Sequence, residues 1–245
     1  MTTIIDFLEL LNCYPNIATH SSMTCCQNNI NPYQQYLTAM KLLNDQSIVN
    51  KNNALKFLEA AAPFSDQAAY ELAGIQATGI YFNGVIEQKI DAKDPNRAFY
   101  WCTIAANNGW LPAQTLLATF YSNGIGVTHN REKAIVWFAL AASKGDPDAL
   151  YVMANIYHYG TDTIAIDEKQ AIYYYTESYK GGQIDATFVL AGFYERGNGV
   201  DKNISQARYL YSIVAEKGYT EAREKMDECT ELLNSRDAIN FYCLI

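Results

Sequence analysis

Apolar side chains along this chain recur at helical spacing, in pairs of segments joined by short turns. One such pair covers residues 112–122 and 131–144, with Gly124 and Gly126 in the turn between them. The apolar positions of each segment lie mostly three or four residues apart and fall on one face of a helix: Ala113, Leu117, Ala118 and Tyr121 in the first, and Ala134, Trp137, Phe138 and Ala141 in the second. The pattern predicts two packed helices, with alanines where they approach closely and large rings filling the space between them.

The same helix pair recurs along the chain with a period of 36 to 37 residues. Three landmark positions keep this register: the alanines Ala98, Ala134, Ala171 and Ala207; the glycines Gly109, Gly145, Gly182 and Gly218; and the alanines Ala113, Ala149, Ala186 and Ala222. A period in this range is typical of solenoids, in which each helical unit buries its apolar face against its neighbours. The sequence therefore predicts an all-α solenoid, and such arrays usually bind other proteins.

Capping residues mark the ends of the predicted helices. An asparagine or aspartate stands four residues before the landmark alanine of each second helix: Asn50, Asp94, Asn130, Asp167 and Asn203. The side-chain oxygens of these residues can accept hydrogen bonds from the free N–H groups of a first helical turn. Each second helix is expected to stop at its glycine, because glycine readily adopts the left-handed conformation that ends many helices.

The repeats divide the chain into three parts. The expected parts are 1–32, an N-terminal helix (3–11) with an irregular segment; 33–228, about five repeats beginning with a helix at 33–43; and 229–245, a C-terminal cap or tail. The last unit starts at Tyr219 and is more polar than the others, as a helix that closes the core of a solenoid must be.

An insertion at 80–93 enlarges one turn of the array into a long loop. Loops of this length are often functional, and the alternative is an insertion that the array merely tolerates. Tyr81, Phe82 and Ile86 favour a loop that folds back on the helices.

The charge of the chain narrows the choice of partner. The formal net charge is −8 and the pI about 4.9, which argues against nucleic acid, because phosphates require a basic surface, and against anionic lipid. A protein partner, a basic one included, is compatible with this charge; the alternative is that the charge only keeps the chain soluble.

Targeting signals are not evident in the sequence. No run of about 18 apolar residues predicts a membrane span, and residues 1–11 carry Asp6 and Glu9 but none of the Lys or Arg of a secretory signal. A cytoplasmic location is expected, with secretion by a signal-independent route left open.

Candidate catalytic and metal-binding groups are few. The histidines His20, His129 and His158 belong to no catalytic triad, HExxH motif or phosphate-binding loop, so no enzymatic activity, cofactor or metal is expected. The cysteines do not follow the repeat and are expected to be reduced: Cys13, Cys25, Cys26, Cys102, Cys229 and Cys243. A remote alternative is a metal-binding or hydrolytic protein that uses the N-terminal Cys13, His20, Cys25 and Cys26, although their spacing is irregular for a zinc site.

Residues 113–145 contain the pattern Ala-x3-Leu-Ala-x2-Tyr-x2-Gly-x-Gly-Val-x2-Asn-x2-Lys-Ala-x2-Trp-Phe-x2-Ala-Ala-x2-Gly. This pattern resembles the SEL-one-like repeat, a relative of the tetratricopeptide repeat. The unit from Ala186 to Gly218 repeats it, the unit from Ala149 lacks the second glycine of the turn, and the unit with the 80–93 insertion departs most. The resemblance implies a right-handed superhelix of antiparallel helix pairs, in which the first helices line a groove that holds protein partners.

The resemblance also places a candidate binding face on the first helices. Positions two, six and nine after the leading alanine lie away from the packing seam, and the residues expected to bind a partner there are Tyr70, Thr115, Thr119, Tyr151, Asn155, His158, Phe188 and Glu195. Aromatic side chains are enriched at binding hot spots; the alternative is that Tyr70, Tyr151 and Phe188 pack between neighbouring helices as core.

The sequence thus favours a non-enzymatic adaptor that binds one protein partner through the concave face of its array. Bacterial relatives are linked to envelope assembly, host interaction and toxin neutralisation, and eukaryotic relatives to protein quality control. A toxin-neutralising immunity protein and a secreted host-directed effector are therefore the alternative functions, and the oligomeric state is open.

Overall fold

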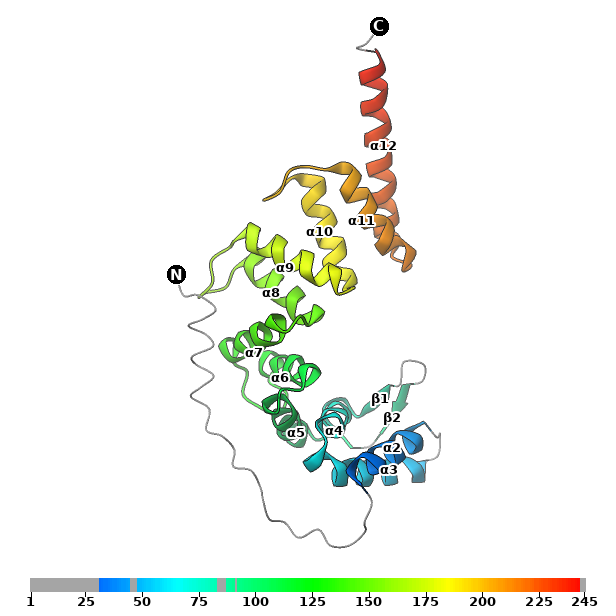
Figure 1. Ribbon diagram of the computed structural model, residues 1–245, viewed down its shortest axis with the longest axis vertical. Coiled ribbons are helices and arrows are strands. Elements are labelled where there is room, and N and C mark those ends of the chain that lie inside the picture. Colours follow the sequence, from blue (N-terminus) through cyan, green and yellow to red (C-terminus); the bar gives the residue numbers. More distant parts are fainter. Residues whose placement is uncertain (1–30, 45–47, 83–86, 91, 243–245) are drawn as a thin grey trace. The chain divides into compact units, whose positions relative to one another are not determined.

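The structure is a computed structural model that describes residues 31–44, 48–82, 87–90 and 92–242. It divides into two compact units, residues 1–140 and 141–245, whose helices and strands are labelled in Figure 1. The elements of the first unit are α2 (Pro32–Leu43), α3 (Ile48–Ala61), the 3-10 turn η1 (Ala62–Phe64), α4 (Asp66–Thr78), β1 (Ile80–Phe82), β2 (Glu87–Lys89), α5 (Pro95–Asn107), α6 (Leu111–Asn123) and most of α7 (Arg131–Ser143). Those of the second unit are α8 (Pro147–Tyr159), α9 (Glu168–Lys180), α10 (Ile184–Arg196), α11 (Ile204–Glu216) and α12 (Thr220–Tyr242). The helix predicted at 3–11 lies outside the described residues.

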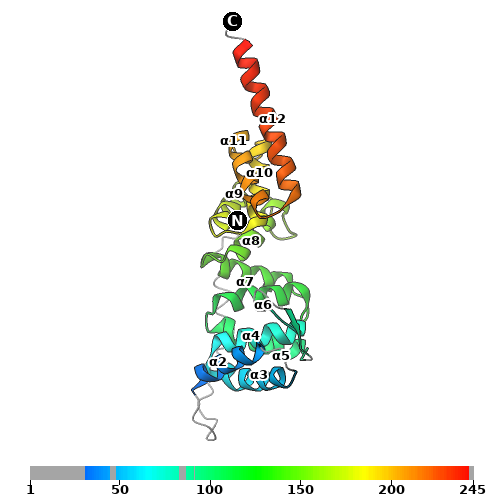
Figure 2. The same cartoon turned by 90° about the vertical axis from the view of Figure 1, so that its right-hand side faces the viewer.

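Consecutive helices pack against each other, as the sequence predicts for an all-α solenoid. In the first unit α2 contacts α3, α4 contacts α5 and α5 contacts α6; in the second unit α8, α9, α10, α11 and α12 pack in sequence order. Figure 2 shows the helix pairs of each unit lying side by side. The landmark alanines occupy the seams: Ala113, Ala149, Ala186 and Ala222 are fully buried, and so are Ala98, Ala171 and Ala207. A small side chain is needed at these positions because interiors are close-packed.

Four of the five predicted caps are present in the structure. The side-chain Oδ1 atoms of Asp94, Asn130, Asp167 and Asn203 accept hydrogen bonds of 2.8–3.1 Å from the backbone N–H three residues further on. The fifth prediction was wrong, because α3 begins at Ile48 and Asn50 lies inside the helix. The landmark glycines Gly109, Gly145, Gly182 and Gly218 all have positive φ, as predicted for residues that end a helix.

The insertion at 80–93 is a β-hairpin and not the long loop that the sequence predicted. Strands β1 and β2 pair in antiparallel register, with Tyr81 opposite Gln88. The hairpin folds back on its own unit, since Tyr81 is buried and its hydroxyl lies 3.8 Å from Sδ of Met40 on α2. Backbone hydrogen bonds from the N–H of Ile90 to Gly79 and from the N–H of Asp94 to Gln76 tie its base to α4. The segment is too short for an alternation of apolar and polar side chains to predict a strand from the sequence.

Helix α12 is one continuous helix, so the predicted boundary between 228 and 229 falls inside it. Its first half packs against α11 and buries Ala222 and Cys229. The exposed Leu232 follows these residues. The N-terminal half of α12 therefore forms the last layer of the second unit.

Candidate functional site

The residues predicted to bind a partner are divided between the two units. Tyr70 lies half-buried on α4, and Thr115 and Thr119 lie half-buried on α6, in the first unit. The hydroxyl of Thr119 donates to the backbone oxygen of Thr115 at 3.0 Å, and the buried hydroxyl of Thr115 has no hydrogen-bond partner among the described residues. The two threonines therefore direct few polar groups toward a partner.

The other five candidates lie together in the second unit, on α8 and α10. Asn155 and His158 share one partner, the fully buried Tyr175 of α9. The hydroxyl of Tyr175 donates to Oδ1 of Asn155 at 2.6 Å and lies 3.2 Å from Nδ1 of His158. A hydroxyl has one hydrogen to donate, so the imidazole Nδ1–H donates back to the Tyr175 oxygen. The polar face of α8 is thus fixed from beneath.

His158 also joins α8 to α10. Its ring lies 4.9 Å from the ring of Phe193 in an edge-on arrangement and 4.3 Å from the ring of Tyr159 in a stacked one. Burial and the guanidinium of Arg196 lower the pKa of His158, while the carboxylate of Glu168 acts in the opposite direction. The imidazole is therefore neutral near pH 7, which suits its place in a hydrogen-bonded network.

The same construction recurs one repeat later. The hydroxyl of Tyr211, a buried residue of α11, donates to Oε2 of Glu195 on α10 at 2.7 Å. The other carboxylate oxygen of Glu195 lies 3.6 Å from the ammonium of Lys225 on α12. The ring of Phe188 meets that of Tyr211 at 5.4 Å. Phe188 and Glu195 are thus both held by one buried tyrosine.

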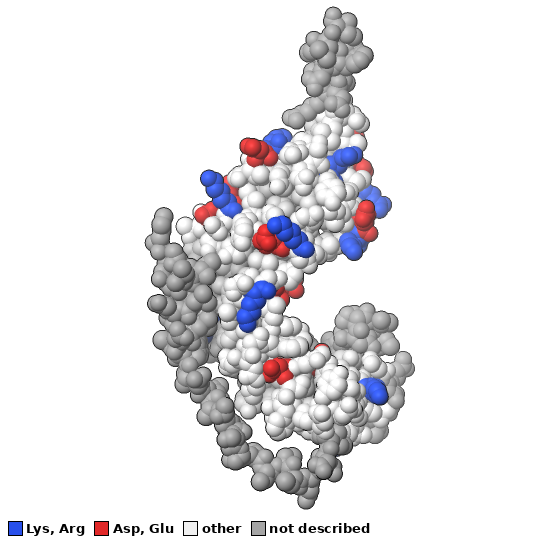
Figure 3. All heavy atoms as spheres, in the orientation of Figure 1, with Lys and Arg blue, Asp and Glu red and all other residues white. Residues whose placement is uncertain are grey.

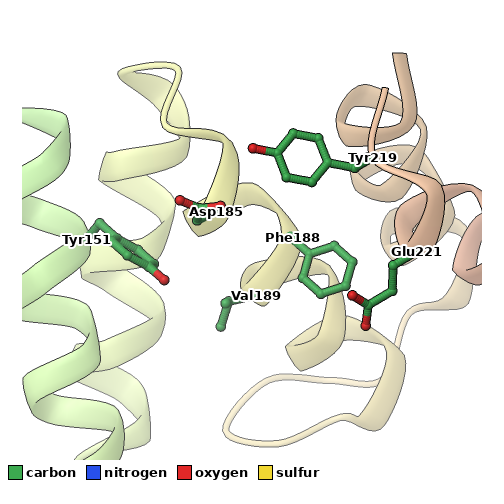
Figure 4. Close-up of a pocket in the computed structure, with 6 residues that line it drawn as sticks. All are labelled: Tyr151, Asp185, Phe188, Val189, Tyr219 and Glu221. Atoms are coloured by element: carbon green, nitrogen blue, oxygen red, sulfur yellow. The ribbon is translucent and has the colours of Figure 1, made fainter. Parts of the chain in front are cut away.

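Tyr151 and Phe188 line a half-open hollow of about 210 Å³ in the second unit. Figure 4 shows its six lining residues, which come from α8, α10 and the start of α12: Tyr151, Asp185, Phe188, Val189, Tyr219 and Glu221. Tyr151 and Phe188 are half-buried, while Asp185, Tyr219 and Glu221 are exposed. The two rings are therefore neither pure core nor fully solvated.

Charges of both signs are spread over the second unit. Figure 3 shows Lys and Arg interspersed with Asp and Glu on the face it presents.

Within the described part of the chain, no three His, Cys, Asp or Glu residues are placed to hold a metal ion. The candidate ligands Cys13, His20, Cys25 and Cys26 lie outside that part. None of the described helices has the length and apolar character needed to cross a membrane.

Raising the pH above about 10 is expected to destabilise the second unit. Its buried tyrosines ionise less readily in the folded unit than in the unfolded chain. Burial, and then Tyr157 and Tyr173, raise the pKa of Tyr174 to about 12, and burial also raises the pKa of Tyr175 and Tyr211. An unfolded tyrosine has a pKa near 10. Between pH 10 and 12 the unfolded chain therefore binds fewer protons than the folded one, and stability falls as pH rises.

Urea unfolding followed by circular dichroism at pH 9, 10 and 11 measures this dependence. Each buried tyrosine contributes at most about 1.4 kcal/mol per pH unit in the window between its two pKa values. Tyr174→Phe is expected to make the fall between pH 10 and 11 shallower, while Tyr219→Phe, at a 48% exposed tyrosine of the same unit, leaves it unchanged. A free energy of unfolding that stays constant from pH 9 to 11 would contradict the prediction.

The repeat seen in the structure matches a known family. The family model described as Sel1 repeat matches residues 66–110, 111–146, 147–183 and 184–219. These four segments coincide with the helix pairs α4–α5, α6–α7, α8–α9 and α10–α11. The chain belongs to the Sel1 repeat family. The pair α2–α3 precedes the matched Sel1 repeats and α12 follows them.

Two curated relatives are similar to this chain in sequence. The chain is 31% identical over 171 residues to the chitin synthase regulator SKT5 of Saccharomyces cerevisiae, a match that covers 67% of this chain and 24% of that protein. It is 29% identical over 160 residues to chitin synthase regulatory factor 2 of Schizosaccharomyces pombe, which covers 62% of this chain and 31% of that protein. The chain thus spans less than a third of either relative.

A solved structure has the same fold. The crystal structure of a Sel1 repeat protein from Oxalobacter formigenes superposes with a TM-score of 0.68 over 96% of this chain and all of that one, at 18% identity. A likeness at this identity supports the solenoid of Sel1 repeats.

Sequence reasoning missed the residues that organise the surface of the last two Sel1 repeats. Tyr175 and Tyr211 stand four residues after the landmark alanine of α9 and α11, where the earlier second helices carry Leu58, Cys102 and Phe138. A change from an apolar side chain to tyrosine at one register position signals a buried hydroxyl that needs a partner. The polar residues Asn155, His158 and Glu195 provide those partners. Asp185, Tyr219 and Glu221 gave no such signal, because the hollow joins residues from different repeats.

Proposed function

We propose that the chain is a protein-binding scaffold whose partner docks on the first helices of the second unit, around Tyr151 and Phe188. Family membership supports protein binding, because solenoid repeats provide extended surfaces for partners. The Sel1 repeats and the regulatory names of the relatives also favour a non-catalytic role.

The observation that carries the proposal is that this surface is already organised. Buried tyrosines fix Asn155, His158 and Glu195 through their hydroxyl groups, and the rings of Tyr151 and Phe188 contact those of Tyr175 and Tyr211. Side chains held in one geometry lose little conformational entropy when a partner binds. A half-buried aromatic pair beside a hollow is also the composition expected of a binding hot spot.

Capture of a partner from a lysate of the source organism tests this proposal. The double variant Tyr151→Ala/Phe188→Ala is expected to capture at least about tenfold less partner than the unmodified chain. Each hot-spot ring contributes about 2 kcal/mol or more to the free energy of binding. A matched control is Tyr173→Ala/Tyr209→Ala, which removes two rings that are 58% and 55% exposed on the second helices α9 and α11. The control is expected to capture as much partner as the unmodified chain.

Circular dichroism and thermal melting of every variant separate lost binding from lost folding. If Tyr151→Ala/Phe188→Ala unfolds the chain, the milder pair Tyr151→Leu/Phe188→Leu keeps an apolar side chain at both positions and repeats the test. Equal capture by a folded double variant and by the unmodified chain would move the partner to another surface and refute the proposed site.

The relatives favour a second, narrower candidate for the partner. Both curated relatives are regulators of chitin synthase by name, so we infer that an enzyme of polysaccharide synthesis is the first partner to look for. Mass spectrometry of the captured protein decides this point. A polysaccharide synthase among the proteins lost in the double variant would support it, and a partner unrelated to polysaccharide synthesis would refute it while leaving the scaffold in place. The immunity-protein and host-directed-effector alternatives stay predictions.

A further inference from the structure

The hollow of the second unit combines three aromatic rings with two carboxylates. The side chains of Tyr151, Phe188 and Tyr219 line it together with Asp185 and Glu221 (Figure 4). The two acids come from the first turns of different helices, Asp185 from α10 and Glu221 from α12. Two negative charges that lie far apart in the sequence therefore line the same hollow in the folded second unit.

Neither carboxylate is neutralised within the described residues. The ion pairs there join Arg97 to Glu59, Lys180 to Glu177, and Lys225 to Glu195 and Glu228. Asp185 accepts one hydrogen bond of 3.3 Å from the neutral amide of Gln183. Both acids are exposed at the surface, and the hollow beside them is open to an incoming group.

The rings supply the other half of a binding site for a cation. Aromatic faces attract cations through their quadrupole, and this attraction strengthens as water is excluded. Tyr151 and Phe188 are held by their contacts with Tyr175 and Tyr211, at 6.1 and 5.4 Å between ring centres. Tyr219 is 48% exposed and lies across the hollow from Tyr151. A cation that enters the hollow therefore meets both aromatic rings and carboxylates in its lining.

We propose that this hollow receives an arginine side chain of the partner protein, an inference that rests on the proposed function of the same surface. A guanidinium stacks on aromatic rings and donates paired hydrogen bonds to carboxylates, whereas a lysine ammonium is a strongly hydrated point charge. An acidic group would be repelled by Asp185 and Glu221. A purely apolar group would bury these carboxylates without a partner, which is costly.

The test uses the full chain and a defined probe, N-acetyl-arginine amide, followed by NMR shifts of the isotope-labelled protein at low salt. Saturable shifts at the lining residues are expected with a dissociation constant in the millimolar range, as for a single side chain. N-acetyl-citrulline amide has the same shape without the charge and is expected to bind at least about tenfold more weakly. Asp185→Asn/Glu221→Gln is expected to reduce binding of the arginine probe by a similar factor.

A matched control variant removes the same charges elsewhere in the second unit. Asp201→Asn/Glu231→Gln alters two exposed acids outside the hollow and is expected to leave binding of the arginine probe unchanged. Equal shifts with the arginine and citrulline probes, or equal binding by Asp185→Asn/Glu221→Gln and the unmodified chain, would overturn the proposal. Absence of any saturable shift up to tens of millimolar would overturn it too.

Capture of the native partner distinguishes failure of this inference from failure of the proposed function. If Tyr151→Ala/Phe188→Ala loses the partner while Asp185→Asn/Glu221→Gln retains it fully, the surface binds a partner without using an arginine, and only the inference fails. If both folded variants retain the partner, the proposed site fails with it. Loss of the partner in both, together with specific binding of the arginine probe, supports both.

Discussion

Replacing Gly126 by alanine is expected to lower the free energy of unfolding by about 2–5 kcal/mol, far more than a surface substitution. Gly126 lies in the turn between α6 and α7 with φ of +66°. An added Cβ would overlap the backbone oxygen of Pro95 and lie 2.5 Å from its carbonyl carbon. Left-handed strain costs an alanine about 1–2 kcal/mol, and forcing extra atoms into a packed site adds about 1–3 kcal/mol.

A neighbouring glycine provides the control for backbone strain. Gly124 lies in the same turn with a nearly identical φ of +69°, but the nearest atom to its added Cβ is the backbone oxygen of Val127 at 3.4 Å. Gly124→Ala therefore suffers the strain without the overlap and is expected to cost about 1–2 kcal/mol. The difference between the two variants isolates the close approach of this turn to the start of α5.

Urea unfolding monitored by tryptophan fluorescence measures both variants. Trp101, Trp110 and Trp137 are all the tryptophans of the chain and lie in the first unit, so their emission reports the unit that contains both glycines. Equal losses of stability in Gly124→Ala and Gly126→Ala would show that the backbone near Pro95 yields at little cost, and the predicted role of Gly126 would be wrong.

The close approach of the turn to the preceding repeat explains why the Gly-x-Gly turn has a second glycine. The Gly-x-Gly turn recurs at Gly197 and Gly199, and a Cβ on Gly199 would lie 2.9 Å from Cβ of Glu168 and from Cδ1 of Ile172 on α9. In both units the second glycine thus lets a turn rest on the second helix of the preceding repeat. Periodicity revealed which positions repeat, but a contact between repeats has no mark in either repeat alone.

Local chemistry was predictable where it acts within a few residues. Asp94, Asn130, Asp167 and Asn203 cap their helices because the acceptor and the N–H group are three residues apart. The exception, Asn50, lies beyond the part of the chain covered by the family match, where α3 starts earlier than the register predicts. The hairpin at 80–90 escaped prediction because its stability comes from packing, for example of Tyr81 against Met40, and not from a strand pattern.

The candidate site was predictable only in part, because much of it depends on packing between segments that are distant in the sequence. Helical periodicity placed Tyr151, Asn155 and His158 on one face of α8, and the structure has them on that helix, half-buried. The choice between core and groove depends on what lies beneath, and the structure puts Tyr175 there. The acids Asp185 and Glu221 reach the hollow only because α10 and α12 both pack against α11, which no single repeat encodes.

Replacing Tyr175 by alanine is expected to lower the free energy of unfolding by about 3–5 kcal/mol, the range for truncating a buried ring. Tyr175 is fully buried, and its ring contacts Tyr151, His158 and Phe193 at 5.7–6.1 Å between ring centres. Its removal leaves a cavity under α8 and α10. The matched control is Tyr173→Ala, two residues away on the exposed side of α9, where a loss within about 0.5 kcal/mol is expected.

Tyr175→Phe separates the ring from its hydroxyl. It keeps the packing but leaves Oδ1 of Asn155 and Nδ1 of His158 without their shared partner, so a cost of about 1–2 kcal/mol is expected. Urea unfolding followed by circular dichroism measures all three variants. A loss in Tyr175→Phe as large as that in Tyr175→Ala would show that the ring contributes little, contrary to its burial.

The hydroxyl of Tyr175 also links stability to binding. Without it Asn155 and His158 are free to adopt other rotamers, and a partner must then order them at a cost of about 0.5–1.5 kcal/mol for each side chain. Tyr175→Phe is therefore expected to weaken capture of the partner at a temperature where the variant is still folded. Unchanged capture by folded Tyr175→Phe would mean that the partner does not rely on the polar face of α8, and the buried tyrosine would then serve the fold alone.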